Sequence, residues 1–253
     1  PQSKGVLKQQ KKKAYGWSET TSENSHQKTM STDIIKLATE KFYQVREAYI
    51  DLLADVNGDD KYFKLAFFFI AFNPVFWNIV ARLEYNTHIL TKLAGSAKRG
   101  CYLLAFTIFS LGIARDYFFE KALQNQVTSQ ILDTDLVKKV GVCFIAVGQV
   151  LVISSMYQLG VTGTYLGDYF GILMENRVTS FPFNVSDNPM YQGSTLSFLG
   201  TSLYFGKAAG LAATVAVNLM YNLALKFEEP FTAKIYAKRE EERRKRKRKK
   251  RRR

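Results

Sequence analysis

Cysteine and histidine are scarce in this sequence of 253 residues. The two cysteines, Cys101 and Cys143, both lie in apolar runs, so we interpret them as small hydrophobic residues and expect no disulfide framework. The two histidines, His26 and His88, are too few for the usual zinc ligand sets, and we expect no metal site. The sequence also lacks a Walker loop, a GxSxG elbow and a Rossmann GxGxxG motif, which argues against the enzyme classes that depend on them.

The body of the chain has no excess of basic residues, although the net charge of the whole chain is +14. Residues 238–253 hold 13 Lys and Arg, and residues 1–29 hold six Lys, whereas residues 30–237 hold 17 basic and 17 acidic residues. A nucleic-acid-binding fold carries its basic residues on the fold itself. The charge distribution therefore predicts no nucleic-acid partner.

Four stretches of the body contain no charged residue: 65–81, 100–114, 140–167 and 208–225. A membrane-spanning helix needs about 20 mostly apolar residues. Helices buried in a large soluble core are the alternative, but four such runs in so short a chain leave little polar surface to cover them. We therefore predict an all-α, polytopic membrane helix bundle with about three full spans, at residues 98–114, 140–162 and 206–226.

The aromatic stretch 62–81 differs from the other apolar runs, because Asn73-Pro74 interrupts it. Proline removes a backbone donor and kinks a helix, and tryptophan such as Trp77 favours the membrane interface. The pattern predicts a re-entrant or interfacial helix in place of a full span.

The two ends of the chain are polar. We expect a disordered polar extension over residues 1–29, and an amphipathic surface helix over 30–60 with apolar residues on one face. The membrane domain would then cover 61–237. Residues 238–253 form a basic tail, of a type that is usually unstructured.

The positive-inside rule uses this tail to orient the chain, and it places the C-terminus in the cytosol. With three spans, the loop 115–139 is then also cytosolic. The middle of the link 163–193 falls on the lumenal side.

Three places hold polar residues that a membrane protein has reason to keep. The first is Ala146-Val147-Gly148-Gln149, where small residues permit close approach, and where helix packing is the favoured interpretation. The second is the link 163–193, which suits either a pocket for a cationic ligand or an ordinary loop with turn residues. The third is Glu228-Glu229, a carboxylate pair at a helix end, which is either compensated by a cation or simply solvated.

Four stretches, 72–84, 159–173, 181–199 and 227–236, together resemble the small membrane phospholipid N-methyltransferases, most closely the fungal members. The resemblance implies S-adenosylmethionine as methyl donor and an endoplasmic reticulum or mitochondrial membrane location. It implies methylation of phospholipid ethanolamine headgroups, chiefly the monomethyl and dimethyl lipids, to phosphatidylcholine. The alternative is a non-enzymatic membrane anchor whose basic tail binds anionic lipid or nucleic acid.

The family's donor-binding motifs can be carried over residue by residue. Its Gly-x-Gly falls on Ala146-Val147-Gly148, with Ala146 in place of a glycine, and its Glu-Glu pair falls on Glu228 and Glu229. The segment Asn188-Pro189-Met190-Tyr191-Gln192-Gly193 resembles a donor-site loop, which implies roles for Asn188 and Gly193. Asp187-Asn188 stand where that loop usually has a basic residue and a histidine.

Methyl transfer to an amine needs a deprotonated acceptor, which a carboxylate or tyrosine can provide. Our candidates for this catalytic role are Asp168, Asp187 and Tyr191. The expected partners are a phospholipid substrate and the bilayer itself. The sequence predicts no particular oligomeric state.

Overall fold

The computed structural model describes residues 36–251, so the predicted polar extension 1–29 lies outside the described residues. The described residues divide into two compact units, with the boundary between Asp51 and Leu52. Residues 36–54 are helical, in agreement with the amphipathic helix predicted for this part of the chain. Apolar side chains on this helix, such as Val45 and Tyr49, are exposed.

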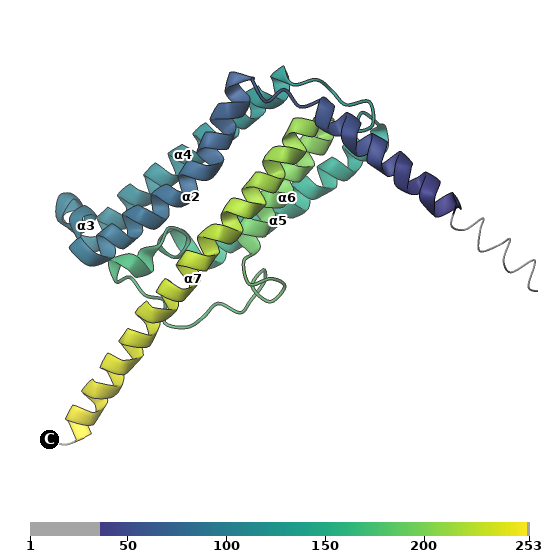
Figure 1. The fold of residues 1–253 in the computed structure, drawn as a ribbon. Coiled ribbons are helices and arrows are strands. Elements are labelled where there is room, and N and C mark those ends of the chain that lie inside the picture. The colour runs from purple at the N-terminus through teal and green to yellow at the C-terminus, as the bar shows by residue number, and fades with distance from the viewer. Residues whose placement is uncertain (1–35, 252–253) are drawn as a thin grey trace, which may run out of the picture. The chain divides into compact units, whose positions relative to one another are not determined.

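The second unit is built from helices, and its described residues contain no strand (Figure 1). The all-α prediction is confirmed. In chain order the elements are α2 (Lys61–Thr87), α3 (Ile89–Ala94), α4 (Ala97–Asn125), α5 (Asp135–Thr164), the 3-10 helix η1 (Gly167–Phe170), α6 (Pro189–Tyr204) and α7 (Ala208–Arg251).

Side chains cap the starts of three of these helices. Asp60 accepts a hydrogen bond from the Phe63 backbone N–H at the start of α2, Ser96 accepts from Arg99, and Thr134 accepts from Val137. These are the residue types that satisfy the free N–H groups of a first turn. Gly95, with a φ of 79°, ends α3 in the left-handed conformation that glycine adopts without strain.

Within residues 36–251, four helices are long and apolar enough to cross a membrane: Lys61–Thr87, Ala97–Asn125, Asp135–Phe170 and Ala208–Lys249. The predicted break at Asn73-Pro74 is absent, because α2 runs through Pro74 as one helix. Proline is more frequent in membrane helices than in soluble ones. Asn78 donates to the Pro74 carbonyl at 3.0 Å, and Asn73 donates to the Leu111 carbonyl of α4, also at 3.0 Å.

Helices α2 and α4 pack side by side, and α6 packs between α5 and α7 (Figure 1). The α5–α6 contact is made by glycines. A Cβ atom on Gly141 would lie 2.7 Å from the Gly200 carbonyl oxygen, and one on Gly148 would lie 2.5 Å from that of Gly193. Small residues let two helices approach this closely.

Relative to the C-terminal tail, the predicted sides of the link and of the loop 115–139 are both wrong. The link lies at the same end of the bundle as the C-terminal half of α7: Asn188 Nδ2 is 3.0 Å from Glu229 Oε1, and Arg239 donates to the Met174 carbonyl at 2.7 Å. The turn after α4 lies at the opposite end, where Ser129 bonds to Gly206. The difference arises because α6 makes an additional pass alongside α5.

The basic tail is also more ordered than its composition predicts. Helix α7 continues through Pro230 and through the basic run to Arg251, so residues 238–251 are helical. In Figure 1 this half of α7 extends away from the other helices of the bundle.

Candidate functional site

A cavity of about 940 Å³ lies among α2, α4, α5, α6, α7 and the link. Such a volume suits a small-molecule site. Five of the residues that sequence analysis proposed for the site line it: Asp168, Asp187, Asn188, Tyr191 and Glu228.

Among the described carboxylates of the cavity, Glu228 accepts hydrogen bonds from the most residues. Its Oε1 accepts hydrogen bonds from Trp77 Nε1 at 2.5 Å and from Asn78 Nδ2 at 2.8 Å, and its Oε2 accepts from the Tyr191 hydroxyl at 2.8 Å. Hydrogen bonds to an ionised acceptor are stronger than neutral ones. The three donors come from α2 and α6, so this one side chain of α7 ties three helices together.

Asp168 reaches the cavity from η1. The Thr232 hydroxyl of α7 donates to Asp168 Oδ2 at 2.8 Å. The neighbouring Tyr169 is buried and stacks on Phe231, with ring centroids 5.0 Å apart and planes at 10°. The second carboxylate of the cavity is therefore held against α7 as well.

Two buried hydroxyls beside Asp168 have no hydrogen-bond partner among the described residues, Thr164 Oγ1 and Tyr169 OH. Thr164 lines the cavity. A buried polar group without a partner is costly. The Thr164 hydroxyl is thus suited to a polar ligand at this end of the cavity.

Asp187 and Glu229 are more peripheral than Asp168 and Glu228. Asp187 pairs with Arg177 at 2.9 Å, but both side chains are more than three-quarters exposed. Glu229 is exposed and does not line the cavity; it accepts a hydrogen bond from Asn188, which does.

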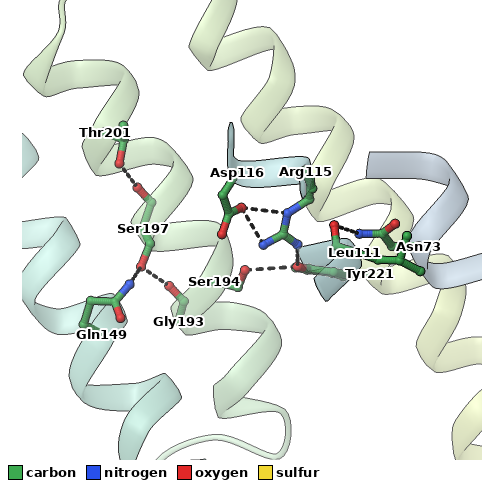
Figure 2. Close-up of polar contacts among 10 residues, drawn as sticks. All are labelled: Asn73, Leu111, Arg115, Asp116, Gln149, Gly193, Ser194, Ser197, Thr201 and Tyr221. Carbon is green, nitrogen blue, oxygen red and sulfur yellow. Dashed lines mark hydrogen bonds and ion pairs between the residues drawn. The ribbon is translucent and has the colours of Figure 1, made fainter. Parts of the chain in front are cut away.

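The predicted donor motif Ala146-Val147-Gly148 is not brought to Glu228. Gly148 is buried against Gly193 in the α5–α6 contact, whereas Ala146 and Val147 are exposed. None of the three lines the cavity, and neither does Gly193. The next residue, Gln149, does, and it donates to Ser197 Oγ at 3.1 Å (Figure 2).

Sequence analysis missed several cavity residues. Trp77 and Asn78 lie within the stretch 72–84 that carries the family resemblance, but nothing in the sequence pointed to Glu228 as their partner. In the sequence, Arg115 could be identified only as the residue that ends the uncharged stretch 100–114. In the structure it lines the cavity and bonds to Tyr221 of α7 (Figure 2).

The chain was compared with known proteins. A family model described as phospholipid methyltransferase matches residues 137–239. The phosphatidyl-N-methylethanolamine N-methyltransferase of Saccharomyces cerevisiae is 59% identical over 196 residues, 78% of this chain and 95% of the relative. The enzyme of the same name from Emericella nidulans is 60% identical over 178 residues, 70% of this chain and 87% of the relative.

A more distant relative is similar over a comparable share of the chain. The human phosphatidylethanolamine N-methyltransferase is 46% identical over 188 residues, 74% of this chain and 94% of the relative. No solved structure matches. The identity and the coverage confirm the resemblance seen in the sequence, and the chain belongs to the phospholipid methyltransferase family.

Proposed function

We propose that this enzyme transfers methyl groups from S-adenosylmethionine to the amine of phospholipid ethanolamine headgroups, and that its final product is phosphatidylcholine. The observation that carries the proposal is the Glu228 cluster, a carboxylate held by three donors in a cavity between membrane helices. The names of the relatives support the acceptor class, and those of the fungal relatives favour the monomethyl lipid. Nothing in the comparisons supports a non-enzymatic anchor.

The residues at the tail end of the cavity fit the methyl donor. The donor carries a cationic sulfonium, an ammonium group and ribose hydroxyls. Glu228 offers a carboxylate to the cations, and Thr164 offers a hydroxyl that lacks a partner among the described side chains. When bound, S-adenosylmethionine supplies a methyl group that an amine displaces from sulfur.

The protein's own contribution is mainly to hold reactive groups in place. Positioning of two reactants can lower a barrier by about 7–11 kcal/mol. Trp77 and Tyr191 stack with centroids 6.5 Å apart, and both donate to Glu228, so the orientation of the rings and of the carboxylate is coupled. Aromatic faces also attract ammonium groups, which suits the methylated products.

The acceptor amine must lose a proton, and Asp168 is the best placed of the three catalytic candidates to receive it. It lines the cavity and its one side-chain partner, Thr232, is neutral. The Tyr191 hydroxyl donates to Glu228, so we assign Tyr191 a positioning role. Asp187 pairs with Arg177, so we assign it a role at the cavity edge.

The remaining candidates act through their neighbours in this proposal. Glu229 fixes Asn188 at the cavity wall. Gly148 and Gly193 set the α5–α6 spacing that brings Tyr191 to Glu228, and Ala146 and Val147 flank that contact. No metal ion is required.

Orientation and location complete the proposal. The C-terminus is cytosolic, and the membrane is that of the endoplasmic reticulum or the mitochondrion. Glu228 and Asp168 lie near the contacts between the link and the tail half of α7, so this orientation opens the donor end of the cavity to the cytosol, where a soluble donor is available.

The test is an assay of membranes from cells that express the full chain. Membranes receive methyl-labelled donor together with unmethylated, monomethyl or dimethyl phosphatidylethanolamine, and the lipid products are separated. We expect label in the dimethyl and trimethyl lipids. Absence of label from every lipid, with the protein present and inserted, would contradict the proposal.

A further inference from the structure

Arg115 has no role in the function proposed above, although it is placed unusually. It lies in α4, within the candidate span Ala97–Asn125, and its side chain is only 14% exposed. It lines the same cavity as Glu228. Ionisable side chains inside membrane helices are costly, so they usually face the bundle interior. There they commonly mark a substrate path.

The guanidinium has capacity to spare for a ligand. Its Nε and Nη2 lie 2.9 and 2.8 Å from Asp116 Oδ1, and its Nη1 donates to the Tyr221 hydroxyl at 2.6 Å (Figure 2). A guanidinium has five N–H groups, so two remain after these three contacts. The Ser194 hydroxyl lies 3.0 Å from that of Tyr221 and adds another donor beside the cavity.

Pairing with Asp116 does not explain why Arg115 turns inward. The Asp116 side chain is 59% exposed, whereas that of Arg115 is 14% exposed, so the carboxylate does not hold the guanidinium in the interior. An ion pair between two adjacent residues can form at a surface as well as in a cavity. Arg115 instead lies over the Phe198 ring, 4.8 Å from its centroid, and bonds to α7.

The cavity wall on the Arg115 side is apolar and faces outward. Phe109 and Ile113 of α4 and Ile153 of α5 all line the cavity, and their side chains are 54%, 56% and 63% exposed. In a bilayer these side chains face acyl chains. A lipid can therefore reach Arg115 between α4 and α5, by a path that a water-soluble molecule cannot easily follow.

A row of aromatic rings joins Arg115 to the Glu228 end of the cavity. Tyr221 packs on Tyr191, with centroids 4.8 Å apart, and Tyr191 stacks with Trp77. Tyr221 and Glu228 are seven residues apart on α7, which corresponds to about 10 Å along the helix axis. A headgroup with an anionic end at Arg115 would extend its amine along these rings.

We propose that Arg115, with the hydroxyls of Tyr221 and Ser194, binds the phosphate of the phospholipid acceptor. The planar guanidinium suits phosphate because it offers paired N–H donors. This inference rests on the proposed function, since it assigns a part of the acceptor to a part of the cavity. The donor's carboxylate is the competing anion, and kinetics distinguish the two.

The test compares two acceptors in the Arg115→Gln variant. One is monomethyl phosphatidylethanolamine. The other is a diacyl lipid that carries N-methylethanolamine through an ether bond, without phosphate. If the wild-type enzyme uses the second lipid too slowly to measure, its inhibition constant replaces its KM.

We expect the KM of the phospholipid to rise at least about 30-fold, since losing one partner of a buried charge contact weakens binding by that much or more. The phosphate-free lipid and the donor should change by less than about threefold. The control is Arg99→Gln, because Arg99 is exposed on the same helix and does not line the cavity.

An equal rise of KM for both lipids would show that Arg115 only stabilises the bundle, and it would overturn the proposal. A raised KM for the donor would assign Arg115 to the donor's carboxylate, and it would overturn the proposal as well. If Arg115→Gln does not fold, Tyr221→Phe is used in its place. The proposal is then overturned if the ratio of the two lipids' KM values is the same in Tyr221→Phe as in the wild type. A wild-type protein that methylates no lipid would instead refute the proposed function.

Discussion

The indole nitrogen of Trp77 donates a 2.5 Å hydrogen bond to the carboxylate of Glu228, 151 residues further along the chain. This contact joins α2 to α7 at the point where Tyr191 of α6 reaches the second carboxylate oxygen. Glu228 therefore has two duties: it holds three helices in register, and it presents negative charge to the cavity.

Glu228→Gln should raise the KM of the methyl donor at least about tenfold. The substitution removes the charge that we assign to the donor's cationic groups, and losing one partner of a buried charge contact costs about 2–5 kcal/mol. Donor KM, measured at saturating lipid, checks this. The matched control is Glu229→Gln, for which we expect a smaller effect, because Glu229 is exposed and touches the cavity only through Asn188. An unchanged donor KM in Glu228→Gln would refute the assignment.

Asp168→Asn should lower kcat by about 100-fold or more with little change in donor KM, since general base catalysis contributes about 10²–10⁴-fold. Thr232→Val is the control, because it removes the hydrogen bond to Asp168 but keeps the carboxylate. Single-turnover rates with the monomethyl lipid measure the chemical step. Full activity in Asp168→Asn would mean that water takes the proton.

Gly148→Ala should destabilise the fold, because the added Cβ would lie 2.5 Å from the Gly193 carbonyl oxygen. Overpacking of this kind costs about 1–3 kcal/mol. Thermal unfolding in detergent measures the loss. Ala146→Gly, two residues earlier and exposed, should keep activity within a few-fold. If Gly148→Ala instead unfolds like the wild type but binds donor poorly, Gly148 is a donor-site residue.

Truncation after Glu242 should leave methyl transfer in detergent within a few-fold of wild type. The removed residues, 243–253, are basic and contact neither the cavity nor the link in the described part of the tail. The cut must spare Arg239, which donates to the Met174 carbonyl at 2.7 Å. Activity of the purified, correctly folded truncation checks this, and an inactive protein would make the tail part of the enzyme.

Apolar run lengths predicted the helical class and three of the candidate spans, because a membrane helix requires a long uncharged stretch. The same criterion missed the pass made by α6, whose 16 residues are too few to register as a span. Sequence analysis also predicted no full span for α2, because Asn73-Pro74 was interpreted as a break, whereas the helix continues through Pro74.

The candidate site was predictable where family motifs are local. Asp168, Tyr191 and Glu228 were named from the sequence and line one cavity. Arg115 and Tyr221 were not, because their relationship joins α4 to α7 across 106 residues and has no local pattern. One predicted motif, at Gly148, occupies a helix contact, which was the favoured reading of its residues alone.

The central claim is that the cavity around Glu228 transfers methyl groups to phospholipid. Its most direct test is the rate of label transfer from S-adenosylmethionine to monomethyl phosphatidylethanolamine by the purified full chain in a lipid bilayer, with wild type and Glu228→Gln compared at a donor concentration below the wild-type KM. We predict labelled dimethyl and trimethyl lipid from the wild type, and at least about tenfold slower labelling by Glu228→Gln. No labelled lipid from the folded wild type, or equal rates from the two proteins, would contradict the account.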